Sequence, residues 1–284
     1  MVDAVENALQ PHDKEMRQHP RKRMYRARAH SNPLNDSNFD VPAHPDDYDW
    51  SRHYPAFFSR DAPEGTGSQQ QEPEDPSETG TPSAQQQQAA VRFADVGCGF
   101  GGLLVKLAPL YPDTLMLGME LRDKVSEYVR ERILALRDQH SPQYSNIACL
   151  RTNAQKHLVN YFRKGQLTKL FFLFPDPHFK AGTHRRRIIS RAQLADYAYL
   201  LAPGGMLYTI TDVPELGKWM REKSDAHPLF QRMSDEELAT DPAACLLDKA
   251  TEEGQKVARN SGLTMRSVYR RLESPVSLRS QPRQ

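Results

Sequence analysis

Long apolar runs are missing from this sequence. No stretch approaches the ~20 consecutive apolar residues that a membrane-spanning helix needs, so we expect no membrane segment. The first residues also lack the basic-then-apolar layout of a secretion signal. The mean hydropathy is -0.72, which is polar for a compact enzyme and indicates that part of the chain is not packed in a core.

Cysteine is scarce as well. The three cysteines, Cys98, Cys149 and Cys245, are scattered and form no C-x-x-C pair. We therefore expect reduced thiols in the cytosol or nucleus, and neither a structural zinc nor another metal site.

A basic segment near the N-terminus contrasts with the small net charge of +2. Between Lys14 and His30, seven Lys or Arg residues, Arg26 and Arg28 among them, accompany a single acid, Glu15. Such runs bind phosphates or act as nuclear import signals. A solvated tail explains the composition equally well, and we expect residues 1–30 to form a disordered basic arm.

The following segments differ in composition. Residues 31–58 are rich in aromatic side chains and predict an ordered extension that packs on the core. Residues 59–90 contain glutamine runs with Pro, Glu and Ser but no large apolar residue, so burial cannot offset the entropy cost of ordering them. We expect a disordered insertion there, one domain over residues 91–276, and a disordered tail at 277–284.

Strand and helix patterns alternate from residue 91 onward. Apolar runs predict strands at Val91–Val96, Leu115–Met119, Ile147–Arg151, Leu170–Phe174 and Met206–Thr211. Helical patterns fall at 103–110, 123–137, 156–162, 191–201 and 214–225, and Gly204-Gly205 is expected to end the fourth. This alternation predicts a doubly wound, mostly parallel sheet, with an antiparallel edge strand near 267–272.

The glycine-rich stretch Asp95–Gly102 (DVGCGFGG) joins the first strand to the first helix. Glycines allow a sharp turn and a close approach of the backbone to a ligand, and the helix N-terminus offers free N–H groups. The spacing fits both the dinucleotide pattern G-x-G-x-x-G and the first motif of S-adenosylmethionine-dependent methyltransferases. A tight turn without a ligand is the third alternative, and the loop alone does not decide.

Polar residues at the ends of the next two strands extend this candidate site. Glu120 ends the second strand, 18 residues after Gly102, where a carboxylate can accept hydrogen bonds from two ribose hydroxyls. Arg122 follows and either supports Glu120 or contacts the ligand. Asn153 ends the third strand, where its amide can bond an adenine ring, and Ala154 leaves room for that ring.

The fourth strand runs into Pro175-Asp176-Pro177, in which two prolines restrict the backbone on both sides of one carboxylate. A second basic cluster follows closely: Lys180, His184, Arg185, Arg186 and Arg187. An acid beside such a cluster favours a nucleic-acid substrate, with the acid at a base edge and the cations at phosphates. A dehydrogenase has no use for this arrangement.

Several motifs together resemble the eukaryotic tRNA (guanine-N7)-methyltransferases. They are FFLFPDPHFK at 171–180, DVGCGFGGLL at 95–104, YTITDV at 208–213, TEEG at 251–254 and RARAH at 26–30. The resemblance covers nearly everything from 91 to 272. Ala181, Gly182 and Thr183 depart from it, because the family usually has more Lys or Arg there.

The resemblance implies a class I S-adenosylmethionine-dependent methyltransferase, with a Rossmann-like sheet, that methylates N7 of a guanine in the tRNA variable loop. Asp176 would be the catalytic acid, and Arg26, Arg28 and the second basic cluster would bind RNA. The implied cofactor-binding residues are Gly97, Glu120, Leu121, Arg122, Asn153, Ala154, Leu173, Thr251, Glu252 and Glu253.

The same resemblance implies a nuclear enzyme with a non-catalytic WD-repeat propeller as partner subunit. Four alternatives stay open at this point: a methyltransferase that acts on another RNA, a methyltransferase that acts on a protein or small molecule, an NAD-dependent dehydrogenase, and a catalytically inactive RNA-binding subunit of the same fold. Intact Asp95–Gly102, Glu120 and Asp176 speak against the last of these.

Overall fold

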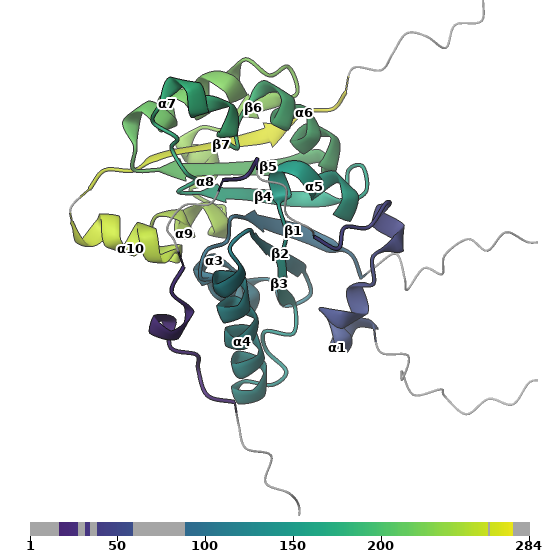
Figure 1. Ribbon diagram of the computed structural model, residues 1–284. Helices are drawn as coiled ribbons and strands as arrows, with labels where there is room; N and C mark the ends of the chain where they lie inside the picture. Colours follow the sequence, from purple (N-terminus) through teal and green to yellow (C-terminus); the bar gives the residue numbers. More distant parts are fainter. Residues whose placement is uncertain (1–16, 28–31, 35–38, 59–88, 261, 275–284) are drawn as a thin grey trace, which may run out of the picture.

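The computed structural model describes residues 17–27, 32–34, 39–58, 89–260 and 262–274 (Figure 1). Arg28, the predicted tail at 277–284 and nearly all of the predicted insertion at 59–90 lie outside these ranges. Within them, the strands form one sheet in the order β3-β2-β1-β4-β5-β7-β6. Their bounds are β1 Val91–Val96, β2 Leu115–Glu120, β3 Ile147–Arg151, β4 Leu167–Leu173, β5 Leu201–Thr211, β6 Phe230–Arg232 and β7 Met265–Arg271.

The sheet is mostly parallel. β1 pairs in parallel with β2 and β4, and the parallel set continues outward to β3 and β5. β7 pairs antiparallel with β5, and β6 antiparallel with β7. The predicted doubly wound sheet with an antiparallel edge is thus confirmed. Strand order reverses between β1 and β4, and ligands of such sheets bind at the carboxyl ends of the strands beside this point.

Helices cover both faces of the sheet (Figure 1). Those described are α1 Pro55–Phe58, α3 Gly102–Leu107, α4 Asp123–Gln139, α5 Ala154–Tyr161, α6 Arg191–Leu200, α7 Pro214–Asp225, α8 Asp235–Leu238, α9 Pro242–Ala250 and α10 Glu252–Arg259. Buried side chains of α5, α6 and α7 form one core with the sheet, and those of α3, α4, α8 and α9 form the other. No helix in the described part of the chain is long and apolar enough to cross a membrane.

The start of β5 differs from the sequence prediction. Leu201 already belongs to the strand and pairs with Leu167, whereas the next pair joins Met206 to Lys169. Residues 202–205 therefore form a bulge within β5 instead of a turn that ends α6. Leu201, the first residue of the strand, is fully buried.

The prediction of a disordered basic arm is wrong for residues 17–27. This segment lies beside α4 and contains a short 3-10 helix (Figure 1). The Lys22 ammonium lies 2.7 Å from the Glu252 carboxylate of α10. The Tyr25 ring contacts the Tyr128 ring of α4 edge-on, with 5.6 Å between their centroids. Composition alone could not predict these contacts, because Glu252 and Tyr128 lie far from the segment in the sequence.

The aromatic-rich extension packs on the core face formed by α5. Within residues 39–58, Tyr54 is fully buried and its hydroxyl donates a 2.8 Å hydrogen bond to the Met116 carbonyl of β2. The Trp50 indole stacks on Phe162, with 6.0 Å between the ring centroids. The extension thereby covers apolar surface that the domain alone would leave exposed.

Candidate active site at the carboxyl edge of the sheet

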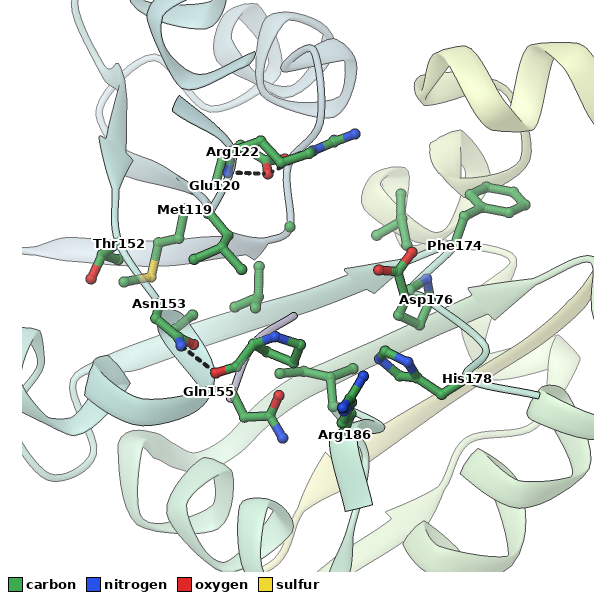
Figure 2. Close-up of a pocket in the computed structure, with 18 residues that line it drawn as sticks. Met119, Glu120, Arg122, Thr152, Asn153, Gln155, Phe174, Asp176, His178 and Arg186 are labelled. Atoms are coloured by element: carbon green, nitrogen blue, oxygen red, sulfur yellow. Dashed lines mark hydrogen bonds and ion pairs between the residues drawn. The ribbon is translucent and has the colours of Figure 1, made fainter. Parts of the chain in front are cut away.

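A pocket opens where β1, β2, β3 and β4 end (Figure 2). Eight of the predicted cofactor-binding and catalytic residues line it: Gly97, Glu120, Leu121, Arg122, Asn153, Ala154, Leu173 and Asp176. These residues come from four strand ends that are far apart in the sequence. They meet because all four strands run in parallel and finish at the same edge.

The glycine loop forms one wall. Gly97 and Gly99 have φ of +73° and +54°, and a Cβ built on either would meet no atom within 4 Å. The far end of the loop is tightly packed, because a Cβ on Gly102 would lie 2.4 Å from the Ala250 carbonyl oxygen. The loop thus leaves open space at its start and presses against α9 at its end.

Glu120 is buried at the end of β2 and accepts four hydrogen bonds. Its Oε2 accepts from the Gly99 N–H at 3.1 Å and from Arg122 Nη2 at 3.1 Å. Its Oε1 accepts from the Arg122 N–H at 2.9 Å and from Arg122 Nε at 3.0 Å. Of the two predicted roles of Arg122, support of Glu120 is the one seen here. A ribose bound to Glu120 has to replace part of this guanidinium contact, since a carboxylate offers about four acceptor sites.

Asn153 directly precedes α5, and its side chain is also hydrogen-bonded within the protein. Its Nδ2 donates a 2.6 Å hydrogen bond to the Pro33 carbonyl oxygen, and Pro33 lines the pocket. The amide predicted to face adenine therefore holds the N-terminal segment instead. A bound adenine would take over this amide or share it with Pro33.

The acidic residue of the glycine motif lies deeper. Asp95 is only 2% exposed, and its Oδ2 has no hydrogen-bond partner among the described residues. Burial, reinforced by the nearby charges of Glu120 and Glu252, raises the pKa of Asp95 to about 7. A cationic ligand near the loop would favour the ionised form of this carboxyl.

The segment after β4 brings the predicted catalytic acid into the pocket. Phe174 and His178 have φ of 49° and 44°, which non-glycine residues rarely adopt. The Phe174 N–H donates to the Ile210 carbonyl of β5 at 2.8 Å, which fixes the start of the turn. Figure 2 shows Asp176 and His178 on the side of the pocket opposite Glu120 and Asn153.

Comparison with known proteins decides between the cofactor classes that the glycine loop leaves open. Residues 89–266 match the model of a family described as "Putative methyltransferase". Over 253 residues, the chain is 58% identical to the tRNA (guanine-N(7)-)-methyltransferase of Zea mays, which covers 89% of this chain and 93% of that protein. The protein of the same name in Homo sapiens is 53% identical and covers 90% of each chain. The chain belongs to this tRNA (guanine-N7)-methyltransferase family.

Among solved structures, the 16S rRNA methyltransferase KamB is similar to this chain, with a TM-score of 0.44 and 18% sequence identity. The match covers 66% of this chain and 90% of the KamB chain. Membership in a methyltransferase family favours S-adenosylmethionine over the dinucleotide that Gly97, Gly99 and Gly102 also fit. The open cradle at Gly97 and the buried acid Glu120 suit this cofactor.

Three predicted cofactor contacts of this methyltransferase lie outside the pocket. Thr251 caps α10, with its Oγ1 accepting from the Gly254 N–H at 3.0 Å. Glu252 pairs with Lys22 of the arm, and Glu253 lines a separate hollow. Thr251 and Glu252 at the start of α10 are thus engaged by the helix cap and by the arm.

Arg187, predicted to bind RNA, is buried, and that prediction is wrong for this residue. It is 1% exposed. Its Nε donates to the Pro177 carbonyl oxygen at 2.9 Å, and its Nη2 donates to Glu215 Oε1 at 2.7 Å. A side chain enclosed in this way cannot reach an RNA phosphate.

The other predicted RNA contacts divide into two groups. Lys180, Arg185 and Arg26 are exposed and accessible to a polyanion. Arg186 lines the pocket, and its buried Nε has no hydrogen-bond partner within the described ranges. His184 is half-buried, with its ring 5.4 Å from an indole of α7, and offers little surface to RNA.

Pro33 and His178 are among the pocket-lining residues that sequence reasoning missed. For His178 a signal existed, since it follows Pro175-Asp176-Pro177 directly within a quoted motif. For Pro33 none existed, because its place at Asn153 depends on a contact between residues 120 positions apart.

Proposed function

We propose that this enzyme transfers a methyl group from S-adenosylmethionine to N7 of a guanine in the variable loop of tRNA, forming 7-methylguanosine. The observation that carries the proposal is the pocket itself, in which Glu120 lies on one side and Asp176 on the other. The names of relatives that match about nine-tenths of this chain at 51% identity or more support the guanine N7 of tRNA as the acceptor.

The residues present fit the cofactor. Glu120 would accept hydrogen bonds from the ribose, Asn153 and Ala154 would adjoin the adenine, and Leu173 would form the apolar floor. When bound, S-adenosylmethionine supplies a methyl group on a positively charged sulfur, which is open to attack by a nucleophile. Gly97, with no side chain, leaves room for the ligand beside the backbone.

Asp176 would select and hold the target base. Guanine N7 carries an in-plane lone pair and no proton, so the reaction needs alignment of the reactants and no strong general base. The carboxylate can accept hydrogen bonds from guanine N1–H and the exocyclic amine, a donor pair that adenine lacks. Methylation leaves positive charge on the base, and a fixed carboxylate favours that charge as it develops.

The exposed cations would hold the RNA backbone while the base enters the pocket. Lys180 and Arg185 follow Asp176 closely in the chain and face solvent. Extrusion of a base from a structured RNA costs a few kcal/mol, which backbone contacts have to offset. Arg186, at the pocket wall, would contact the phosphate or sugar nearest the target base.

A partner subunit and a location complete the proposal. The resemblance to the eukaryotic form supports a heterodimer with a non-catalytic WD-repeat propeller. The same resemblance and the basic segment around Arg26 support a nuclear location.

The proposal is tested by methyl transfer from labelled S-adenosylmethionine to bulk tRNA, with analysis of the nucleosides for 7-methylguanosine. The assay is run with and without a co-expressed WD-repeat subunit. Product in both arms establishes the reaction and an enzyme active alone, and product only with the partner makes this the catalytic half of a pair. No product in either arm, with cofactor binding intact, contradicts the proposed acceptor.

Asp176→Ala should abolish methyl transfer and leave the Kd of the cofactor within about twofold, because the carboxylate contacts the base and not the cofactor. Asp113→Ala, at an exposed acid in the turn before β2, is the matched control and should behave like the wild type. Normal turnover by Asp176→Ala would show that Asp176 is not required to hold the target base.

A further inference from the structure

Arg187 connects the turn that carries Asp176 to helix α7. Its side chain is 2% exposed, whereas that of its ion-pair partner Glu215 is 57% exposed. Its Nε and Nη2 reach Pro177 and Glu215, and its guanidinium lies 4.8 Å from the centre of the Trp219 ring. Glu215 and Trp219 both belong to α7, so the arginine is held by one rigid element.

Two backbone hydrogen bonds help to fix the turn between Phe174 and His178. Pro175 and Pro177 have no N–H to donate, so the backbone can be anchored there only through its carbonyl groups. The first anchor is the Phe174 N–H, which bonds to β5. The Arg187 bond to the Pro177 carbonyl is the second.

The second anchor lies beside a strained residue. Pro177 directly precedes His178, whose φ of 44° is unfavourable for a side chain with a Cβ. Such a conformation persists only where the surroundings determine it. The bond at Pro177 opposes relaxation of His178 to an ordinary φ, and that relaxation would redirect the neighbouring Asp176.

From this geometry we propose that Arg187 is a positioning residue for methyl transfer: its bond to the Pro177 carbonyl sets the direction in which Asp176 and His178 enter the pocket. Arg187 touches neither base nor cofactor and acts through the turn. The inference extends the proposed function, because the step that depends on Asp176 is the alignment of the target base.

The kinetic test compares Arg187→Met, which keeps the length of the side chain but removes its donors, with Arg187→Lys, which retains one charged donor group. We expect Arg187→Met to lower kcat for tRNA methylation at least tenfold. The Kd of S-adenosylmethionine and the KM for tRNA should stay within twofold. Arg187→Lys should recover part of kcat, because one Nζ can still reach the Pro177 carbonyl.

Arg271→Met is the matched control for lost packing. Arg271 is also buried, at 6% exposure, and its Nε likewise donates to a backbone carbonyl, that of Ala198, at 3.1 Å. It does not line the pocket. We expect Arg271→Met to lower the melting temperature about as much as Arg187→Met and to leave kcat within twofold. An equal loss of kcat in Arg187→Met and Arg271→Met would show that Arg187 has only a structural role.

Amide hydrogen exchange provides a readout that does not depend on activity. Arg187→Met should accelerate exchange in peptides that cover residues 174–180 and leave those that cover the glycine loop at 97–102 unchanged. Unchanged exchange at 174–180 would overturn the inference, as would a raised KM for tRNA at constant kcat, which is the behaviour of an RNA contact. If the wild type fails to methylate tRNA, the proposed function fails while the exchange experiment still decides on Arg187.

Discussion

The buried acid Asp95 should make the stability of the enzyme depend on pH in an unusual direction. Its pKa rises from 3.8 to about 7 on folding, because burial and the charges of Glu120 and Glu252 disfavour the carboxylate. Between these two values the folded protein keeps a proton that the unfolded chain has released. The free energy of unfolding therefore falls as the pH rises from about 4 to about 7, and this contribution levels off above it.

The magnitude follows from the two pKa values. At 1.36 kcal/mol for each tenfold change in proton affinity, the complete effect is about 4 kcal/mol. Between pH 5 and pH 8, where urea unfolding is practical, about 3 kcal/mol of it should be visible. This is a large fraction of the 5–15 kcal/mol that typically stabilises a domain.

Asp95→Asn removes the titrating group and keeps the shape of the side chain. The free energy of unfolding of cofactor-free wild type and variant is measured by urea titration at half-unit intervals from pH 5 to pH 8. The difference between the two should change by about 3 kcal/mol over this range, with the wild type losing stability relative to the variant as the pH rises. Parallel pH profiles would refute the assignment of a raised pKa to Asp95.

Two further substitutions test the walls of the pocket. Glu120→Ala removes the buried acceptor for the ribose. Because hydrogen bonds to a charged group contribute about 1.5–3 kcal/mol, the Kd of S-adenosylmethionine measured by calorimetry should rise roughly tenfold to a hundredfold. An unchanged Kd would exclude the ribose contact. Gly102→Ala places a methyl group 2.4 Å from the Ala250 carbonyl oxygen and should cost about 2 kcal/mol of stability in urea unfolding. Gly182→Ala, where a Cβ meets nothing within 4 Å, is its control, and equal stability of the two variants would contradict the packing argument.

The sheet was predictable from sequence because each parallel strand is buried on both faces. β2 illustrates this: every residue from Leu115 to Glu120 is buried, so the run reads as continuously apolar up to its functional end. The same principle placed Glu120 and Asn153 at one edge, since parallel strands end together. The bulge at Gly204-Gly205 was not predicted, because glycine pairs mark helix ends and strand bulges alike.

The individual roles within the basic cluster were not predictable. Arg185, Arg186 and Arg187 are consecutive and chemically identical, yet the structure exposes the first, turns the second to the pocket and buries the third. The difference arises from Glu215 and Trp219, which follow Arg187 by about 30 residues and reach it only through the fold. Local patterns of charge carry no information about partners at that separation.

The order of the strands also has a consequence for synthesis of the chain. β7, at Met265–Arg271, lies between β5 and β6, although it is the last of the described strands in sequence. Until those residues leave the ribosome, the outer edge of β5 has no neighbour, and β6 has no strand to pair with. An unpaired edge of a largely apolar strand invites pairing with other chains. The nascent enzyme thus depends on residues 265–271 to close the sheet, and a truncation that removes β7 would free two strands at once.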